Sequence, residues 1–309
     1  MTKVDIENSS FTNFLIENRN RCFHIVNLPG NNGDELIHRG LYKKMKELGI
    51  NFHVTNVTKN HLYYLLRFLY SKLGVPSHIS IKPDCDFVLL QGGGYMSDLF
   101  GLCEGCRLLE AISSYKPIVV APQTFYFINL DFSKILKKIT NKIYLFCREE
   151  QSFRLLQKMD LPDHVFTSVS HDTAFYFDKS DFGDRKNGYD LLSFRKGSEA
   201  KLSFSEKKAL IKYLADNGRK IYNIDASVSG TYQDFVKLIR NADRIFTDRL
   251  HVGIVGSILE KETFLFPNIY FKNKAVYDYS LKMYSKTRFL NSVEKGLRDL
   301  LTNKCKKDL

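Results

Sequence analysis

The sequence predicts an α/β fold of two Rossmann-like domains, each a parallel sheet with helices on both faces. Short apolar runs alternate with amphipathic stretches along the 309 residues, which is typical of repeated βαβ units. A chain of this length is typical of a protein with about two domains. The polar stretch KSDFGDRKNG at 179–188 interrupts the alternation and has the composition of a linker. We therefore expect an amino-terminal domain over 1–178 and a carboxy-terminal domain over 179–309.

The amino-terminal elements follow from apolar periodicity. Residues 33–49 place Leu36, Leu41 and Met45 on one helical face, and Gly49 ends the pattern. Strands are expected where short runs are rich in β-branched and aromatic residues. The expected strands are 22–30, 51–57, 86–94, 117–123 and 143–148, and the expected helices are 33–49, 61–74, 104–114, 132–142 and 149–159.

The carboxy-terminal half repeats the alternation after the linker. Its last helix precedes the basic tail KCKKDL and could pack back on the first domain. The expected strands are 189–195, 220–226, 244–248 and 263–268, and the expected helices are 203–218, 231–242, 249–260, 274–284 and 292–303.

Charge and hydropathy narrow the class of protein. A net charge of +12 attracts anions such as phosphorylated metabolites, nucleic acid or an acidic membrane face. The basic residues do not interleave with aromatics as in a recognition motif, so no nucleic-acid partner is expected. No apolar run reaches about 20 residues, and the first 21 residues lack a signal-peptide core. We expect a cytoplasmic protein whose basic segments, SKILKKITNK and NKCKKDL, either contact the inner membrane face or are simply solvated. The oligomeric state is left open.

The cysteines and the acidic pair near residue 85 do not predict a metal site. CEGC at 103–106 has the spacing of a metal or redox pair, but no second pair completes a zinc set. Buried thiols in a reducing cytoplasm are the simpler expectation. Asp84 and Asp86 resemble the metal-holding DxD motif of some glycosyltransferases but sit at the start of their strand, which is the wrong end of the sheet. We expect no metal.

Ligands of such sheets bind beyond the carboxyl ends of the strands, where two segments are rich in glycine. The segment GNNGD contains Asn31, Gly33 and Asp34 and either cradles a phosphate or sugar or forms a Pro-Gly turn before a helix. The run Gly92–Gly94 ends a buried strand and indicates close approach of a ligand or of another backbone segment.

Cationic side chains follow four strands. Arg148 and Arg195 can each bind a carboxylate or phosphate through two hydrogen bonds, or form a structural salt bridge. In TDRLH, Asp248 is expected to cap the next helix, with Arg249 and His251 in its first turn. A histidine there can act as general acid or base. The segment YFKN adds Tyr270, Lys272 and Asn273 after the last strand, although Tyr270 could serve packing alone.

Taken in order, GNNGD, QGGG, PQT, CREEQS, HDTAF, SFRKGSE, TDRLH and YFKN resemble the polysaccharide pyruvyltransferase family, from about residue 22 to about 280. The resemblance implies a glycosyltransferase-B-like arrangement with the active site in an interdomain cleft. By motif position, Arg148, His251 and Lys272 match its phosphoenolpyruvate-binding and catalytic residues. This sequence has His171 where the family commonly has proline, and Phe271 where it commonly has glycine. The substrate-binding set implied is Asn31, Gly33, Asp34, Gly92, Gly93, Gly94, Gln123, Asp172, Arg195, Arg249, Tyr270 and Asn273.

The activity implied is transfer of a carboxyethylidene group from phosphoenolpyruvate to a hexose of a bacterial surface polysaccharide or exopolysaccharide precursor, carried on a lipid or a nucleotide. Phosphoenolpyruvate is a co-substrate, and no cofactor is expected. Two alternatives share these features. One is a glycosyltransferase that uses a nucleotide-sugar donor, and the other is a non-catalytic binding protein of the same fold.

Overall fold

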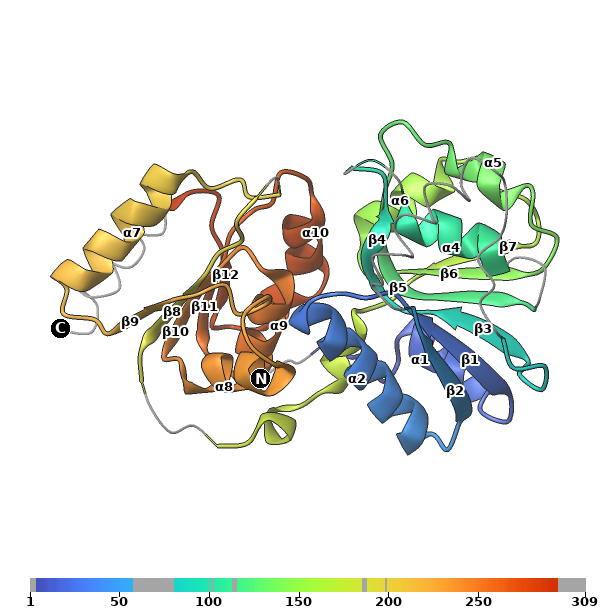
Figure 1. Ribbon diagram of the computed structural model, residues 1–309, viewed down its shortest axis with the longest axis horizontal. Helices are drawn as coiled ribbons and strands as arrows, with labels where there is room; N and C mark the ends of the chain where they lie inside the picture. The colour runs from blue at the N-terminus through green and yellow to red at the C-terminus, as the bar shows by residue number, and fades with distance from the viewer. Residues whose placement is uncertain are drawn as a thin grey trace. The chain divides into compact units, whose positions relative to one another are not determined.

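A computed structural model describes residues 4–57, 81–99, 101, 103–112, 116–184, 188–197 and 199–293 (Figure 1). The chain forms two compact units. The amino-terminal unit comprises Asp5–Gly30 and Ile37–Tyr176, and the carboxy-terminal unit comprises Val4, Asn31–Leu36 and the chain from Phe177 onward. Folding as separate domains on either side of residue 178 stays a prediction.

The amino-terminal unit is built on a parallel sheet. In the described residues its strands run in the order β2-β1-β3-β5-β6-β7, and β4 also pairs with β5. The chain places β2 on one side of β1 and then adds β3 and the later strands on the other side, as in doubly wound sheets. The strands are β1 (Cys22–Asn27), β2 (Asn51–Asn56), β3 (Phe87–Leu90), β4 (Gly93–Ser97), β5 (Ile118–Tyr126), β6 (Ile143–Cys147) and β7 (Val165–Val169).

Helices cover both faces of this sheet, and its central strand β3 is apolar at every position, as expected of a strand buried on both sides. Val88 and its neighbours on one face pack with residues of α4 (Glu104–Ile112), α5 (Phe132–Leu136) and α6 (Glu150–Gln157). Phe87 points the other way, where Phe14 of α1 (Ser10–Glu17) packs against it with ring centroids 5.7 Å apart. Figure 1 shows α4 and α6 on one side of the sheet and α1 on the other.

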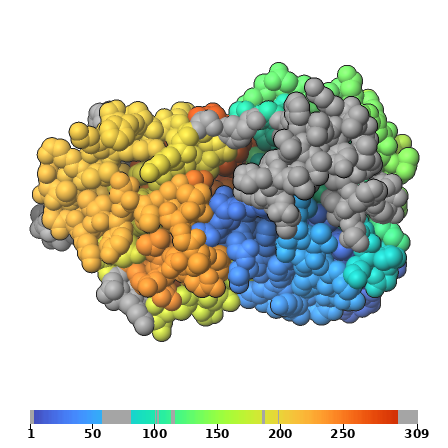
Figure 2. All heavy atoms as spheres, viewed as in Figure 1, coloured from blue at the N-terminus to red at the C-terminus, as the bar shows by residue number. Residues whose placement is uncertain are grey.

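The carboxy-terminal unit has a second parallel sheet, ordered β12-β11-β10-β8-β9 in the described residues. Helix α9 is buried at nearly every residue. Capping boxes begin α7 and α8, at Ser203 with Glu206 and at Thr231 with Asp234. In Figure 2 the yellow and orange atoms belong to the segments of the chain that include these helices. The elements are β8 (Asp190–Ser193), β9 (Ile221–Asn223), β10 (Arg244–Thr247), β11 (Glu262–Leu265), β12 (Thr287–Phe289), α7 (Phe204–Asp216), α8 (Tyr232–Asn241), α9 (Leu250–Ile258) and α10 (Lys272–Tyr279).

Helix α2 (Asn32–Glu47) spans the division between the units, and 3-10 turns lie at Thr173–Tyr176, Lys179–Phe182 and Leu281–Met283. No helix among the described residues is long and apolar enough to cross a membrane. The helices expected at 61–74 and over most of 292–303, and the basic tail, lie outside the described residues.

Some element expectations were wrong. The single strand expected at 86–94 is two strands, because the backbone changes direction at Gly92 and Gly93. Helix α5 ends at Leu136 rather than near 142, before the poor helix formers Thr140 and Asn141. Three short elements, α1, β7 and β12, were not expected at all.

Candidate functional site

Three cations of the carboxy-terminal unit stand at the carboxyl ends of adjacent strands. Arg195 follows β8, Arg249 follows β10, and Lys272 begins α10 after β11. Their side chains are 14%, 12% and 9% exposed, so each charge is largely withdrawn from water. Burial and the nearby Arg249 lower the pKa of Arg195. The unit therefore gathers three cationic side chains at one edge of its sheet.

Two carboxylates, which the sequence analysis did not single out, pair with these cations. Asp225 accepts hydrogen bonds from both Nε and Nη2 of Arg249, with Nε at 2.9 Å. Glu199 forms ion pairs with Arg195 and with Lys272, whose Nζ lies 3.1 Å from Oε2. Removing either carboxylate would leave its cations poorly compensated.

Asp248 does not cap α9, so that expectation was wrong. The N-cap residue is Arg249, and it makes no capping hydrogen bond through its side chain. Asp248 is fully buried, and its Oδ1 accepts the backbone N–H of Arg195 at 2.8 Å. Burial raises the pKa of Asp248, against the lowering effect of that hydrogen bond and of the nearby cations. Asp248 thus joins the ends of β8 and β10.

Asn273 and Lys272 stand at the start of α10, and Asn273 ties the ends of β10 and β11 together. The Asn273 amide donates to the carbonyl oxygens of Asp248 and Phe266, both at 2.8 Å. Lys272 Nζ lies 5.1 Å from the centroid of the Tyr270 ring. The backbone N–H of Ile269 donates to the carbonyl of Glu199, which ties the YFKN loop to the loop after β8.

The glycine segment 31–36 lies against His251 in the same unit. A Cβ on Gly33 would overlap the imidazole ring, with Cγ of His251 only 2.9 Å away. Gly33 N–H donates to Asn31 Oδ1, and Asn31 N–H donates to Asp34 Oδ2, both at 2.8 Å. The Asn32 N–H donates to the carbonyl of Ser227 at 2.9 Å. Close approach of the backbone to an imidazole is therefore the reason for glycine here.

Arg148 lies at the matching strand end of the amino-terminal unit and is 1% exposed. Its Nε donates to Thr124 Oγ1 and its Nη1 to Asp172 Oδ2, both at 2.8 Å. A Cβ on Gly94 would lie 3.6 Å from Nη2. The salt-bridge alternative is thus present, with Asp172 as partner, and the guanidinium also borders the glycine run. Thr124 was not predicted.

Buried polar groups surround this strand end. The carboxamides of Gln91 and Gln123 are 1% and 0% exposed and have no hydrogen-bond partner among the described residues. A buried carboxamide without a hydrogen-bond partner destabilises the folded state unless another polar group or a bound molecule forms hydrogen bonds with it. Burial raises the pKa of Glu149, the N-cap of α6, to about 7. Burial also lowers the pKa of His171 to about 4, so this histidine is neutral near neutral pH.

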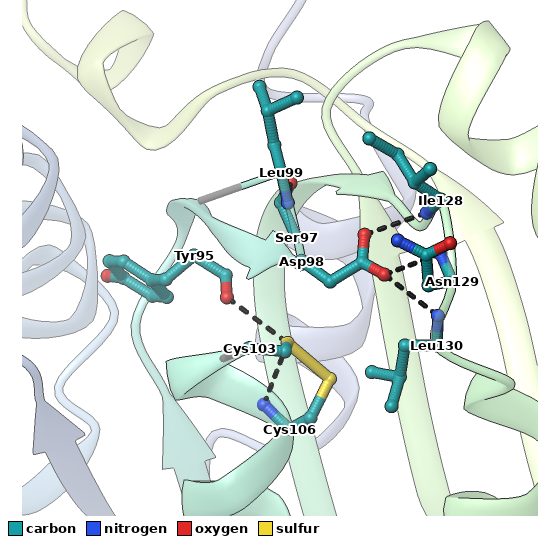
Figure 3. Close-up of a disulfide and its surroundings, with 9 residues drawn as sticks. All are labelled: Tyr95, Ser97, Asp98, Leu99, Cys103, Cys106, Ile128, Asn129 and Leu130. Atoms are coloured by element: carbon teal, nitrogen blue, oxygen red, sulfur yellow. Dashed lines mark hydrogen bonds between the residues drawn. A yellow bond between two sulfur atoms is a disulfide. The ribbon is translucent and has the colours of Figure 1, made fainter. Parts of the chain in front are cut away.

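The expectation of buried thiols at CEGC was wrong, because Cys103 and Cys106 form a disulfide (Figure 3). The bond closes a four-residue loop between β4 and the first turn of α4. Asp98, just beyond β4, accepts the backbone N–H groups of Ile128, Asn129 and Leu130 at 2.7 to 2.8 Å. Both features fix the end of the strand that carries Gly93 and Gly94.

Comparison with known families adds a decisive observation. The family described as polysaccharide pyruvyl transferase matches residues 31–270, which is most of the chain. This protein belongs to the polysaccharide pyruvyl transferase family. The enzyme is also 24% identical over 301 residues to a protein of Bacillus subtilis (strain 168) named "Putative pyruvyl transferase EpsO", with 87% of each chain covered. It is an enzyme of pyruvyl transfer in polysaccharide synthesis.

Solved structures share the fold of this pyruvyl transferase. An uncharacterized protein of Klebsiella pneumoniae, KP1_0663, matches with a TM-score of 0.66 at 22% identity, covering 94% of this chain and 100% of the other. The UDP-GlcNAc 2-epimerase of Neisseria meningitidis matches with a TM-score of 0.54 at 13% identity, covering 91% of each. The expected fold class, two Rossmann-like units of the glycosyltransferase-B-like type, is confirmed.

The structure gathers the predicted residues of the pyruvyl transferase into two groups, one in each unit. The carboxy-terminal group contains His251, Gly33, Arg249, Arg195 and Lys272, and the amino-terminal group contains Arg148, Asp172, Gln123 and Gly94. The role of each residue stays a prediction. Four further residues were missed: Glu199, which follows a predicted strand, Asp225, which lies near the end of one, and Gln91 and Thr124, which belong to QGGG and PQT. Position at a strand end was the signal that could have found them.

Proposed function

We propose that this enzyme transfers the carboxyethylidene group of phosphoenolpyruvate to two hydroxyls of a hexose in a bacterial surface polysaccharide or exopolysaccharide precursor. The observation that carries the proposal is the set of buried cations beside His251 at the strand ends of the carboxy-terminal unit. Phosphoenolpyruvate has a carboxylate and a phosphate, and fixed cations suit both groups.

In the proposed reaction, His251 donates a proton to the methylene carbon of phosphoenolpyruvate, which becomes a methyl group. The adjacent carbon acquires oxocarbenium character, one sugar hydroxyl adds to it, and the C–O bond to phosphate breaks. The second hydroxyl then adds and closes the ketal. One of the two hydroxyl protons restores His251, and the other leaves with the phosphate, which departs as hydrogen phosphate. Arg249 and Lys272 stabilise the charge of the departing phosphate. The scheme uses no metal or nucleotide cofactor.

Glu199 and Asp225 set the electrostatic conditions for this chemistry. Each carboxylate already pairs with the cations that would bind the anion, so substrate must share or displace these partners. Arg148 and the uncommitted carboxamides of Gln91 and Gln123 supply hydrogen-bonding groups suited to a sugar acceptor or to the carboxylate.

The test is to incubate the enzyme with phosphoenolpyruvate and a panel of lipid-linked galactose, glucose and mannosamine acceptors. We expect acceptor-dependent release of inorganic phosphate and a mass gain of one carboxyethylidene group. His251→Ala should lower turnover by about 10²- to 10⁴-fold at saturating phosphoenolpyruvate. The matched control, His164→Ala, removes a histidine of the loop before β7 and should leave turnover unchanged.

Other outcomes would contradict the proposal. Release of a nucleoside diphosphate from a nucleotide sugar, with no phosphate from phosphoenolpyruvate, would identify a glycosyltransferase. Near-normal turnover by His251→Ala would remove the acid-base role from His251. The acceptor sugar follows from which member of the panel gains mass.

A further inference from the structure

Three metal-ligating side chains of the amino-terminal unit converge at the amino ends of its strands, opposite the edge that carries Arg148. Cys22 begins β1, His53 lies within β2, and Cys85 lies two residues before β3. One ligand atom from each lies within 4.8 Å of the other two. Cys85 is 1% exposed, whereas Cys22 and His53 are only partly buried. The cluster is therefore sheltered but still reachable from solvent.

Strand register brings these side chains together. Strands β2, β1 and β3 are neighbours, and β1 pairs with β2 so that His24 lies opposite His53. Cys22 precedes His24 by two residues, so it shares the face of the sheet that carries His53. The backbone also fixes Cys22, whose N–H donates to Asp86 Oδ2 at 2.9 Å and whose carbonyl accepts the Asp86 N–H at 2.8 Å.

We propose that Cys22, His53 and Cys85 bind a zinc ion, with the Asp84 carboxylate as fourth ligand. Two thiolates and an imidazole are the donors that zinc prefers. Asp84 Oδ2 lies 3.9 Å from His53 Nε2, within the span of one tetrahedral site. This site is independent of the proposed pyruvyl transfer.

Binding requires only a small rearrangement of the side chains. The two sulfur atoms lie 2.9 Å apart, and tetrahedral zinc with bonds of about 2.3 Å places them about 3.8 Å apart. Rotation of the partly exposed Cys22 side chain can supply this difference of about 1 Å. Both thiols lose their protons to solvent on binding, and neutral His53 contributes a nitrogen lone pair, so each zinc ion releases two protons.

The consequence is structural. The ion would tie the starts of β1 and β2 to the loop before β3. Hydrogen bonds between Cys22 and Asp86, the hydrogen bond from Lys82 N–H to His24 Nδ1 and the ion pair of Arg21 with Asp86 already join β1 to this loop. A metal that binds the folded state raises thermal stability in proportion to its affinity. We therefore expect zinc to raise the midpoint of thermal unfolding.

Titration of the full-length reduced protein with cobalt(II) tests the site, because tetrahedral cobalt with thiolate ligands absorbs visible light. The experiment uses a Cys103→Ser, Cys106→Ser background, so that the CEGC pair cannot contribute. We expect one cobalt per chain with a thiolate charge-transfer band, displaced by one equivalent of zinc. Cys85→Ser should abolish the band or weaken binding at least tenfold, and His53→Asn should weaken it similarly. Cys147→Ser, a buried cysteine of β6, is the matched control.

Three results would overturn the inference. The first is the absence of stoichiometric cobalt binding in the reduced background protein. The second is unchanged binding in a Cys22→Ser, Cys85→Ser double variant. The third is alkylation mapping that finds Cys22 and Cys85 joined as a disulfide in protein isolated with metal present. Circular dichroism of each variant shows whether lost metal binding reflects loss of the site or loss of the fold. Phosphate release from phosphoenolpyruvate, measured in parallel, shows whether the proposed activity is affected independently of metal binding.

Discussion

At the scale of single residues, Gly33 and His251 form a contact that leaves no room for a side chain. A Cβ at position 33 would force the imidazole to move, because the backbone of α2 cannot. We expect Gly33→Ala to lower kcat/KM with phosphoenolpyruvate by about 100-fold, as a displacement near 1 Å can do. Steady-state phosphate release measures the change.

A double-mutant cycle controls for general damage. In a His251→Ala background the alanine at position 33 meets no ring, so it should cost little further activity. Equal losses in both backgrounds would show that Gly33 acts through the backbone of the loop and not through His251.

The buried carboxyl of Glu149 predicts that the stability of the protein depends on pH. Burial raises the pKa of Glu149 in the folded protein to about 7, so the folded state resists ionisation of this carboxyl more than the unfolded state does. The free energy of unfolding therefore falls as pH rises from about 4 through 7. Glu149→Gln keeps an oxygen for the Ser152 N–H and carries no charge. We expect it to raise the free energy of unfolding by up to about 3 kcal/mol at pH 8 and to have little effect at pH 5. Urea unfolding at both pH values measures this.

Glu150→Gln is the matched control, since the side chain of Glu150 is 55% exposed and pairs with Arg154 on the surface. It should change stability little at either pH. A Glu149→Gln variant that is equally destabilised at pH 5 and pH 8 would contradict the buried-charge explanation.

The residues of the candidate site could be predicted better than their partners. Arg148, Arg195, Arg249 and Lys272 stand at strand ends, and a charge in that position is visible in the sequence. Their carboxylates lie up to 73 residues away, as for Lys272 and Glu199, and many acidic residues are equally available. Asp248 was expected to cap the helix that follows it. Its carboxylate instead accepts the N–H of Arg195, which is distant in the sequence, and the sequence does not show which of the two hydrogen bonds forms.

At the scale of elements, the end of β4 is held by Asp98. Burial alone would raise the pKa of this carboxyl, but three N–H donors lower it overall. The carboxylate fixes the turn at 128–130 beside the disulfide loop (Figure 3). We expect Asp98→Ala to speed amide hydrogen exchange at Ile128, Asn129 and Leu130 at least tenfold, as measured by mass spectrometry or NMR.

Asp131→Ala is the matched control, because Asp131 caps α5 through Lys134 N–H and does not contact these three amides. Its effect should be confined to the first turn of α5. Unchanged exchange at 128–130 in Asp98→Ala would mean that packing, and not the carboxylate, holds the turn.

Most long elements could be predicted from periodicity because their apolar faces are continuous. The break at Gly92 could not, since three glycines permit many backbone paths and only the carbonyl of Pro122, 2.5 Å from a Cβ built on Gly92, shows which one is taken. Strand β7 was missed because, with every residue at least partly exposed, it lacks the apolar run of a buried strand.

At the scale of the whole molecule, the net charge of +12 predicts attraction to anionic lipid. We expect the enzyme to sediment with phosphatidylserine vesicles at about 0.05 M salt and to be released at about 0.5 M. Lys134→Glu with Lys138→Glu should weaken this binding, since both side chains are more than 70% exposed. Lys208→Glu with Lys212→Glu on α7 changes the net charge equally and is the matched control. Equal loss in both variants would indicate a nonspecific effect of charge.

The presence of two Rossmann-like units could be predicted from the alternation of strands and helices, whereas the domain boundary at residue 178 stays a prediction. The membership of residues 31–36 could not be predicted, because nothing local distinguishes a loop that ends one sheet's strand from a loop that joins the other unit.

That membership limits how this family can be recombined. A chimaera that takes residues 1–178 from one relative and the remainder from another would place a foreign 31–36 segment against His251. The two halves are therefore not interchangeable modules, and substitutions at positions 31–36 and around His251 must be exchanged together. A transplant of the carboxy-terminal half needs this short stretch of the amino-terminal half as well.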